Sequence, residues 1–200
     1  MLLGKNRLEA FSDGVFAILI TLLILEIEIP ELSKADSRSM LEGLVVLLPK
    51  FSAFVLSYLV LAIYWLSHHD LFARIKYVNG KILWLNLLLL LPMCVIPFTT
   101  SLAGDYPSSS ISVFIYAIHI TIIGIGYTLF ERYLDTLASK KSLDGSVSLA
   151  SHNLRNDLAV ALNVAACVVA FLWPPASFAL LFCSRLVLLI SYWRVSSEKG

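Results

Sequence analysis

The chain has 200 residues, of which 58% are hydrophobic and only 14% are charged, and its formal net charge at pH 7 is +1. Soluble domains carry about 25% charged residues, and a net charge this close to zero gives no reason to expect a nucleic-acid partner. No hydrophilic segment approaches the roughly 50 residues that a separate soluble domain needs. These features predict one integral domain, residues 1–200, embedded in a lipid bilayer.

The first apolar run, residues 7–29, is uninterrupted from Gly14 to Leu25 except at Thr21. A spanning helix needs about 20 mostly apolar residues, and this run reaches that length only if Ser12 and Asp13 lie at or inside the membrane boundary. An intramembrane carboxylate is costly and usually marks a polar partner or an aqueous path. A simple helix cap by Ser12 or Asp13 explains the same pattern equally well.

Helical geometry divides this run into two faces. At about 100° per residue, Ser12 and Asp13 project away from one continuous stripe, which consists of Arg7, Phe11, Gly14, Ile18, Thr21, Leu22 and Leu25. If several copies of the helix surrounded an axis, the stripe would form apolar rings and one hydroxyl ring, with Glu28 near its outer end. The spacing alone favours ordinary helix packing over a lined axis.

Five further apolar runs follow, and they predict an all-α protein with six spans. The expected spans are residues 7–29, 43–67, 80–103, 111–134, 156–173 and 176–194. The third span holds Pro92 and Pro97, which predict a broken helix whose freed carbonyl groups need partners.

The distribution of lysine and arginine predicts the orientation. Basic residues are concentrated in the segments that share a side with the N-terminus: Lys5, Arg7, Arg74, Lys76, Lys81, Arg132, Lys140, Lys141, Arg155, Arg194 and Lys199. The other side has only Lys34, Arg38 and Lys50. Both termini are therefore predicted to be cytoplasmic, with Asp13 near the inner face and Glu28 near the outer mouth.

Several polar residues fall inside or at the ends of spans. His68 and His69 end the second span at the depth predicted for Asp13, so a polar cluster of Asp13, one of these histidines and Asn86 is expected; for all but Asp13, interhelical hydrogen bonding is the favoured role. His119 is expected to be a hydrogen-bonded core residue, and Arg185 to pair with an acidic or carbonyl group or to reach the interface.

The chain carries no GxSxG, P-loop or HExxH motif and no CxxC spacing, so we expect no enzyme activity, no metal and no cofactor. The run from Ile123 to Tyr127 superficially resembles a potassium-filter sequence, but such filters are re-entrant loops. Its two glycines lie within a continuous span, where close helix packing is the better explanation.

Three motifs carry a resemblance to a known family. Arg7-x-x-x-Phe11-Ser12-Asp13 precedes the first apolar run, Trp65-x-x-His68 ends the second, and the third contains Asn86-Leu87 followed by Pro97-Phe98-Thr99. Together they resemble the signature of the transmembrane-protein-175 family of potassium channels, in its single-repeat, six-span prokaryotic form.

The resemblance implies a homotetramer in a prokaryotic plasma membrane that conducts monovalent cations, potassium among them, without a filter loop. The first helix of each subunit would line the axis, with a constriction at Ile18, Leu22 and Leu25 and a hydroxyl layer at Thr21. The signature residues would hold this helix against the second and third spans: Arg7, Phe11, Ser12, Asp13, Trp65, His68 and Asn86.

Two other classes of function stay open at this point. A proton-coupled secondary transporter would use Asp13 and His68 as titrating groups, although no inverted repeat of the kind typical of carriers is visible. A membrane scaffold without transport would use every polar residue for packing alone.

Overall fold

The computed structural model describes residues 4–30, 36–75, 77–139 and 149–197. All regular structure in these residues is helical, so the predicted all-α class is confirmed. The elements are α1 (Lys5–Leu22), the 3₁₀ turn η1 (Leu23–Glu26), α2 (Ser37–Val46), α3 (Leu48–Ala73), α4 (Gly80–Met93), α5 (Ile96–Asp105), α6 (Ser110–Ser139), α7 (Leu149–Leu172) and α8 (Pro174–Ser197).

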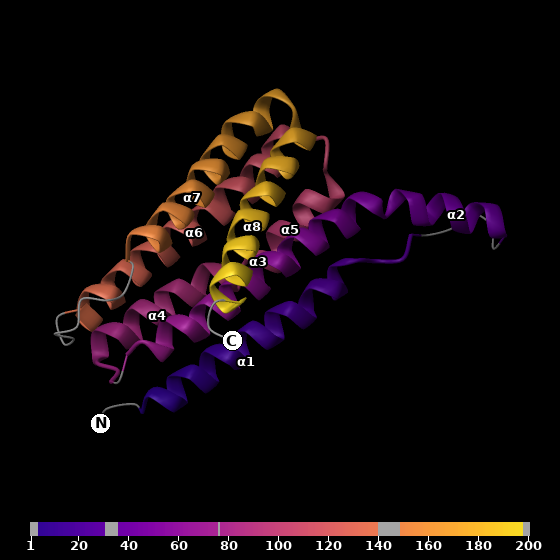
Figure 1. The fold of residues 1–200 in the computed structure, drawn as a ribbon. Helices are drawn as coiled ribbons and strands as arrows, with labels where there is room; N and C mark the ends of the chain where they lie inside the picture. Colours follow the sequence, from indigo (N-terminus) through magenta and orange to yellow (C-terminus); the bar gives the residue numbers. More distant parts are fainter. Residues whose placement is uncertain (1–3, 31–35, 76, 140–148, 198–200) are drawn as a thin grey trace.

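The long helices form one bundle (Figure 1). Helices α6, α7 and α8 pack on one another, while α1 packs against α3 and α4. Helix α3 also contacts α5 and α8, so it connects the N-terminal and C-terminal parts of the bundle. The first helix is thus held along one side only.

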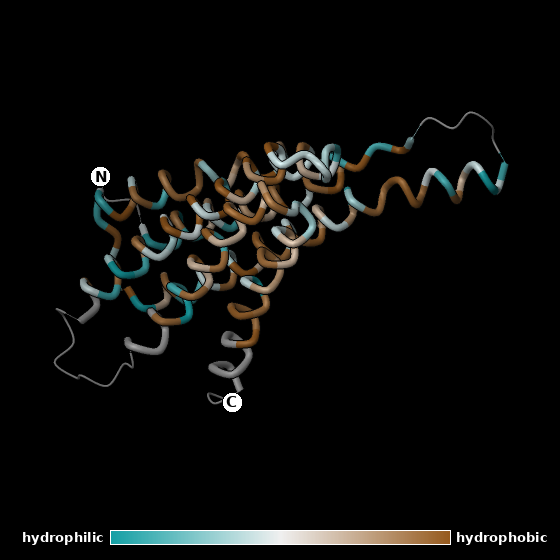
Figure 2. The backbone as a smooth tube through the Cα atoms, turned by 90° about the horizontal axis from the view of Figure 1, so that it is seen from above, coloured by the Kyte–Doolittle hydropathy of each residue, from teal (hydrophilic) through white to brown (hydrophobic). Residues whose placement is uncertain are grey.

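Five helical segments in the described part of the chain are long and apolar enough to cross a membrane: Lys5–Glu26, Leu48–Ala73, Gly80–Asp105, Ser110–Leu137 and Leu154–Leu172. Figure 2 shows hydrophobic residues along the middle of the bundle and hydrophilic residues towards the helix ends. The predicted sixth span corresponds to α8, whose described apolar portion, Pro174–Ile190, is shorter than these five.

Several span boundaries differ from the sequence-based prediction. The first span ends at Glu26 instead of Ile29, because the helix tightens into η1 and then becomes extended at Ile27. The second span begins at Leu48 and not at residue 43, because residues 43–46 belong to the separate helix α2, and it continues to Ala73 instead of ending at residue 67. Asp36 caps α2 by accepting a hydrogen bond from the Ser39 backbone N–H at 2.8 Å; Figure 1 shows α2 extending beyond the bundle.

The predicted break in the third span is present between α4 and α5. The Pro92 carbonyl oxygen at this break accepts from the Val95 backbone N–H at 3.0 Å and also from Nε2 of His119 on α6 at 2.9 Å. The other ring nitrogen, Nδ1, then accepts from the Thr99 hydroxyl at 2.8 Å. His119 is therefore hydrogen-bonded through both ring nitrogens, as expected from the sequence, although its side chain is half-buried and not part of the buried core.

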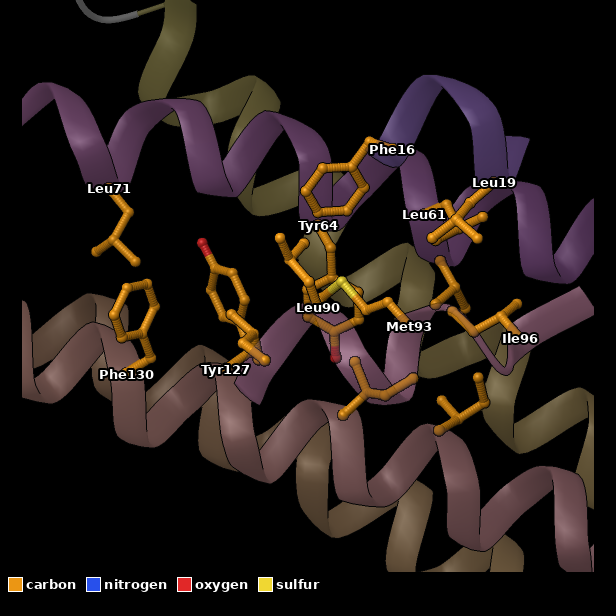
Figure 3. Close-up of a cluster of buried hydrophobic side chains, with 14 of the residues drawn as sticks. Phe16, Leu19, Leu61, Tyr64, Leu71, Leu90, Met93, Ile96, Tyr127 and Phe130 are labelled. Atoms are coloured by element: carbon orange, nitrogen blue, oxygen red, sulfur yellow. The ribbon is translucent and has the colours of Figure 1, made fainter. Parts of the chain in front are cut away.

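Apolar side chains from both parts of the bundle meet in one core (Figure 3). Phe16 and Leu19 of α1 are buried in it with Leu61 of α3, Leu90 and Met93 of α4, and residues of α6 such as Phe130. One face of α1 is thereby committed to the interior of the bundle.

Gly104 marks a close approach between α5 and α3. A Cβ atom at this position would lie 3.0 Å from the Lys50 Cα atom, and overpacking against backbone costs about 1–3 kcal/mol. We therefore expect Gly104→Ala to lower the free energy of unfolding in detergent by about 1 kcal/mol or more. Gly126→Ala is the matched control, since its Cβ would meet only the Leu89 side chain, at 3.5 Å. Equal effects of the two substitutions would contradict this packing.

Candidate functional site

The two faces of α1 have opposite surroundings. The buried residues recur at helical spacing along the face that meets α3 and α4: Leu8, Ser12, Phe16, Leu19 and Leu23. The predicted stripe lies on the other face, and every residue of it is exposed. The division of this helix by face therefore matches the angles read from the sequence.

A buried hydrogen-bonded chain joins α1, α3 and α4. The Asn86 amide nitrogen Nδ2 donates to Ser12 Oγ at 3.0 Å, and the Asn86 oxygen Oδ1 accepts from His68 Nε2 at 2.7 Å. Ser12 in turn donates to the Leu8 carbonyl oxygen at 3.0 Å. All three side chains are buried, so each hydrogen bond also satisfies a polar group that water does not reach.

Asp13 lies beside this chain and not inside it. Its Oδ1 accepts from the Trp65 indole nitrogen Nε1 at 3.0 Å, and both side chains are exposed. Asp13 thus contacts α3 through Trp65, but its side chain stays exposed and does not enter the buried chain. It lies at the edge of the α1–α3 contact, because it follows Ser12 by one residue and is rotated by about 100° around the helix.

Trp65 and His68 are three residues apart on α3, so they share one face of that helix. This explains how Trp65 reaches Asp13 while His68 reaches Asn86. The rings of Phe16 and Phe72 flank His68, with centroids 5.7 Å and 4.5 Å from its own. The other two signature residues, Arg7 and Phe11, are exposed and take no part in these hydrogen bonds.

The predicted lining residues are among the exposed apolar side chains of the protein. Ile18 is 59% exposed, Leu22 40% and Leu25 70%. Leu25 belongs to η1, where residues three apart eclipse one another, so it stays in line with Leu22. Glu28 lies beyond Ile27, the residue that ends η1, and so the helix does not carry it on this face.

Thr21 is exposed within the same stripe, but its hydroxyl is not free to donate. It is hydrogen-bonded to the carbonyl oxygens of its own helix, at 2.8 Å to Ile18 and 3.1 Å to Ala17. The hydroxyl hydrogen therefore points back at the helix, which leaves the oxygen to face outwards as an acceptor.

The structure also contains buried polar contacts that the sequence analysis missed. Ser57 of α3 contacts the hydroxyls of Thr100 and Tyr116 at 2.6 Å and 2.8 Å. At another place Glu131, buried in α6, pairs with Arg74 at 3.7 Å and accepts from Asn156. Hydroxyl and amide side chains within the apolar runs indicate that such hydrogen bonds exist, but the sequence does not show which of these side chains contact one another.

Comparison with known proteins gives the family. The chain is 33% identical to a potassium channel of Chryseobacterium sp. (strain P1-3), over 97% of both chains. The chain belongs to the TMEM175 family. Residues 7–97 match the family model described as endosomal/lysosomal potassium channel TMEM175, and this range holds Arg7-x-x-x-Phe11-Ser12-Asp13, Trp65-x-x-His68 and Asn86.

Two further comparisons support membership of the TMEM175 family. A potassium channel of Streptomyces collinus is 36% identical over 62% of this chain and 61% of its own. The crystal structure of a lysosomal potassium-selective channel TMEM175 homolog from Chamaesiphon minutus superposes with a TM-score of 0.81 at 25% identity, covering 94% of this chain and 97% of that one.

TMEM175 proteins are channels and not enzymes, so the predicted absence of catalysis agrees with the family. The apolar helices and the bacterial relatives identify the chain as an integral membrane protein of a prokaryote. The expected resemblance to this family is confirmed.

Proposed function

We propose that the chain is one subunit of a homotetrameric, potassium-permeable cation channel in the plasma membrane, with α1 of each copy lining the axis. The observation that carries the proposal is the exposed apolar stripe of α1, opposite a face tied to α3 and α4 by hydrogen bonds. One helix cannot enclose a pore, but a closed ring of identical helices does. The potassium-channel names of the bacterial relatives support the choice of ion.

In this proposal Ile18, Leu22 and Leu25 form stacked apolar rings that control ion passage by dewetting. The outward-facing oxygen of Thr21 offers an acceptor for a partly dehydrated cation between them. No filter loop is required, and the run Ile123–Tyr127 lies inside α6 as continuous helix. Glu28 would raise the local cation concentration at the outer mouth.

The topology proposed with it has six spans, α8 being the sixth, and both termini in the cytoplasm. The basic residues near the ends of α1 and α3, among them Lys5 and Arg74, then face the cytoplasm, as the positive-inside rule requires. Ser12, His68 and Asn86 would hold α1 in place near that side of the membrane.

Ion flux through liposomes tests the lining. We expect Leu22→Ala and Ile18→Asn each to raise potassium flux or to change its selectivity by tenfold or more, because a wider or more polar ring lowers the barrier to wetting. Ile122→Asn on α6 is the matched control, since Ile122 is 53% exposed but lies outside α1. Wild-type flux in both α1 variants would overturn the pore assignment.

The rival is a proton-coupled secondary transporter that titrates Asp13 and His68. Asp13→Asn separates the two functions, because an asparagine oxygen still accepts the hydrogen bond from Trp65 Nε1. A channel held together by this contact keeps its potassium flux in the variant. A carrier loses pH-driven, saturable uptake, and that outcome would favour the rival.

A further inference from the structure

Arg185 of α8 is the most deeply buried charged side chain described in the structure, at 1% exposure. Its Nε donates to Ser184 Oγ at 3.1 Å and its Nη2 to Asn163 Oδ1 at 3.0 Å. The guanidinium carbon also lies 5.7 Å from the centre of the Tyr64 ring. All of these contacts are with neutral groups.

The charge of Arg185 has no counter-charge in the described part of the chain. The ion pairs found there use other basic residues: Lys5, Arg38, Lys50, Arg74 and Arg132. The buried carboxylate of Glu131 pairs with Arg74 and accepts from Asn156. An uncompensated buried cation is strongly unfavourable, so a negative charge from another source is expected beside Arg185.

Two hydrogen-bond donors next to this charge lack acceptors. Arg185 Nη1 and Asn163 Nδ2 are both fully buried, and neither has a partner among the described residues. Both groups are donors and neither can accept a hydrogen bond. What is missing is therefore an acceptor, and a cation or a further donor does not satisfy the pair.

A small cavity of about 20 Å³ lies against these donors. Its lining includes Arg185 and Asn163 with Tyr64, Tyr127, Thr128 and Gly124. A Cβ atom on Gly124 would lie 3.3 Å from the Tyr64 hydroxyl and 3.4 Å from Asn163 Nδ2. The glycine thus leaves room beside an unpaired donor, and the room suits one water-sized particle.

We propose that this cavity is a binding site for a single halide ion, chloride in the cell, coordinated by Arg185 Nη1 and Asn163 Nδ2. A monatomic anion fits the cavity, accepts from both donors and neutralises the guanidinium. A water molecule would satisfy the donors but not the charge, whereas phosphate and sulfate are too large. The ion would tie α7 to α8 at the point where both meet α3 and α6, and it lies off the proposed pore.

Thermal unfolding of the full-length protein in detergent tests the site. We expect chloride or bromide to raise the melting temperature by about 5 °C over gluconate at equal ionic strength, since a ligand that binds only the folded state stabilises it. Crystals grown in bromide should show an anomalous peak between Arg185 and Asn163.

Asn163→Asp gives the sharpest variant, because it builds the counter-charge into the protein. The carboxylate keeps the acceptor for Ser184 and Arg185 Nη2, and its second oxygen replaces the unpaired Nδ2 donor with a negatively charged acceptor at the cavity. We expect this variant to be as stable without halide as the wild type is with it, and to lose the halide-dependent shift.

Gly124→Ala should reduce the shift, because its Cβ enters the cavity, while Gly126→Ala on the same helix should leave it unchanged. An equal melting temperature of the wild type in chloride, bromide and gluconate, or no bromide peak in the cavity, would overturn the proposal in favour of a neutral water. A full halide-dependent shift in Asn163→Asp would overturn it as well.

Discussion

Replacing Asn86 by leucine is expected to lower the free energy of unfolding by about 2–5 kcal/mol, because it leaves two buried polar groups without a partner. His68 Nε2 loses its acceptor and Ser12 Oγ loses its donor. Leucine has a similar volume, so the effect reports the lost hydrogen bonds more than a change in packing. Denaturant-induced unfolding in detergent, followed by circular dichroism, measures it.

Asn79→Ala is the matched control on the same helix. Asn79 is exposed and caps α4 by accepting from the Ile82 backbone N–H at 2.8 Å, and loss of such a cap costs about 1 kcal/mol. His68→Phe combined with Asn86→Leu should recover part of the loss, since replacing both partners of a buried hydrogen bond costs less than removing one. Strict additivity of the two single losses would contradict the network.

Phe16→Ala is expected to lower the free energy of unfolding by about 3–5 kcal/mol, as is usual when a buried aromatic side chain is truncated. Phe16 is fully buried, contacts the edge of the His68 ring and lies in the core between α1 and α3 (Figure 3). Its removal opens a cavity behind α1. Thermal and denaturant unfolding of the detergent-solubilised protein both measure the loss.

Phe11→Ala supplies the control on the same helix. Phe11 is 51% exposed in the subunit, and truncation of an exposed side chain costs about 0.5 kcal/mol or less. If the two substitutions destabilised the protein equally, the assignment of the inner and outer faces of α1 would be wrong.

The exposed and packed faces of α1 could be predicted from the sequence because an α-helix has a fixed number of residues per turn. Ile18 and Leu22 lie on the face opposite Ser12, as that spacing requires. The end of the helix could not be predicted in the same way. Isoleucines alternate with glutamates from Glu26 to Ile29, and this pattern does not reveal that the backbone tightens at Leu23 and leaves the helix after Glu26.

The signature residues could be recognised in the sequence, but the hydrogen bonds that they form with one another were harder to predict. Ser12 and Asp13 were both expected to face the packed side, but only Ser12 takes the interior position, while Asp13 contacts Trp65 at the edge. A difference of one residue changes the direction of a side chain by about 100°. Only the precise rotation of α1 against α3 decides which of the two polar neighbours faces inwards.

Buried polar residues in the second half of the chain show a different limit. Arg185 stands out in an apolar run, but its contacts with Asn163 and Tyr64 depend on how three helices are positioned. Hydropathy gives the position of such a residue along its own span. It does not give the neighbours on other helices, because these contacts are set by helix packing and not by local sequence.

The hydrogen bond between Ser12 and Asn86 spans 74 residues of chain, and this separation matters during biosynthesis. A ribosome adds about 5–20 residues per second. Roughly 4–15 s therefore pass between the synthesis of Ser12 on α1 and that of Asn86 on α4. During that interval the Ser12 hydroxyl is satisfied by the Leu8 carbonyl of its own helix. The N-terminal helix is thus able to enter the bilayer alone and to dock later, when Trp65, His68 and Asn86 have all been synthesised.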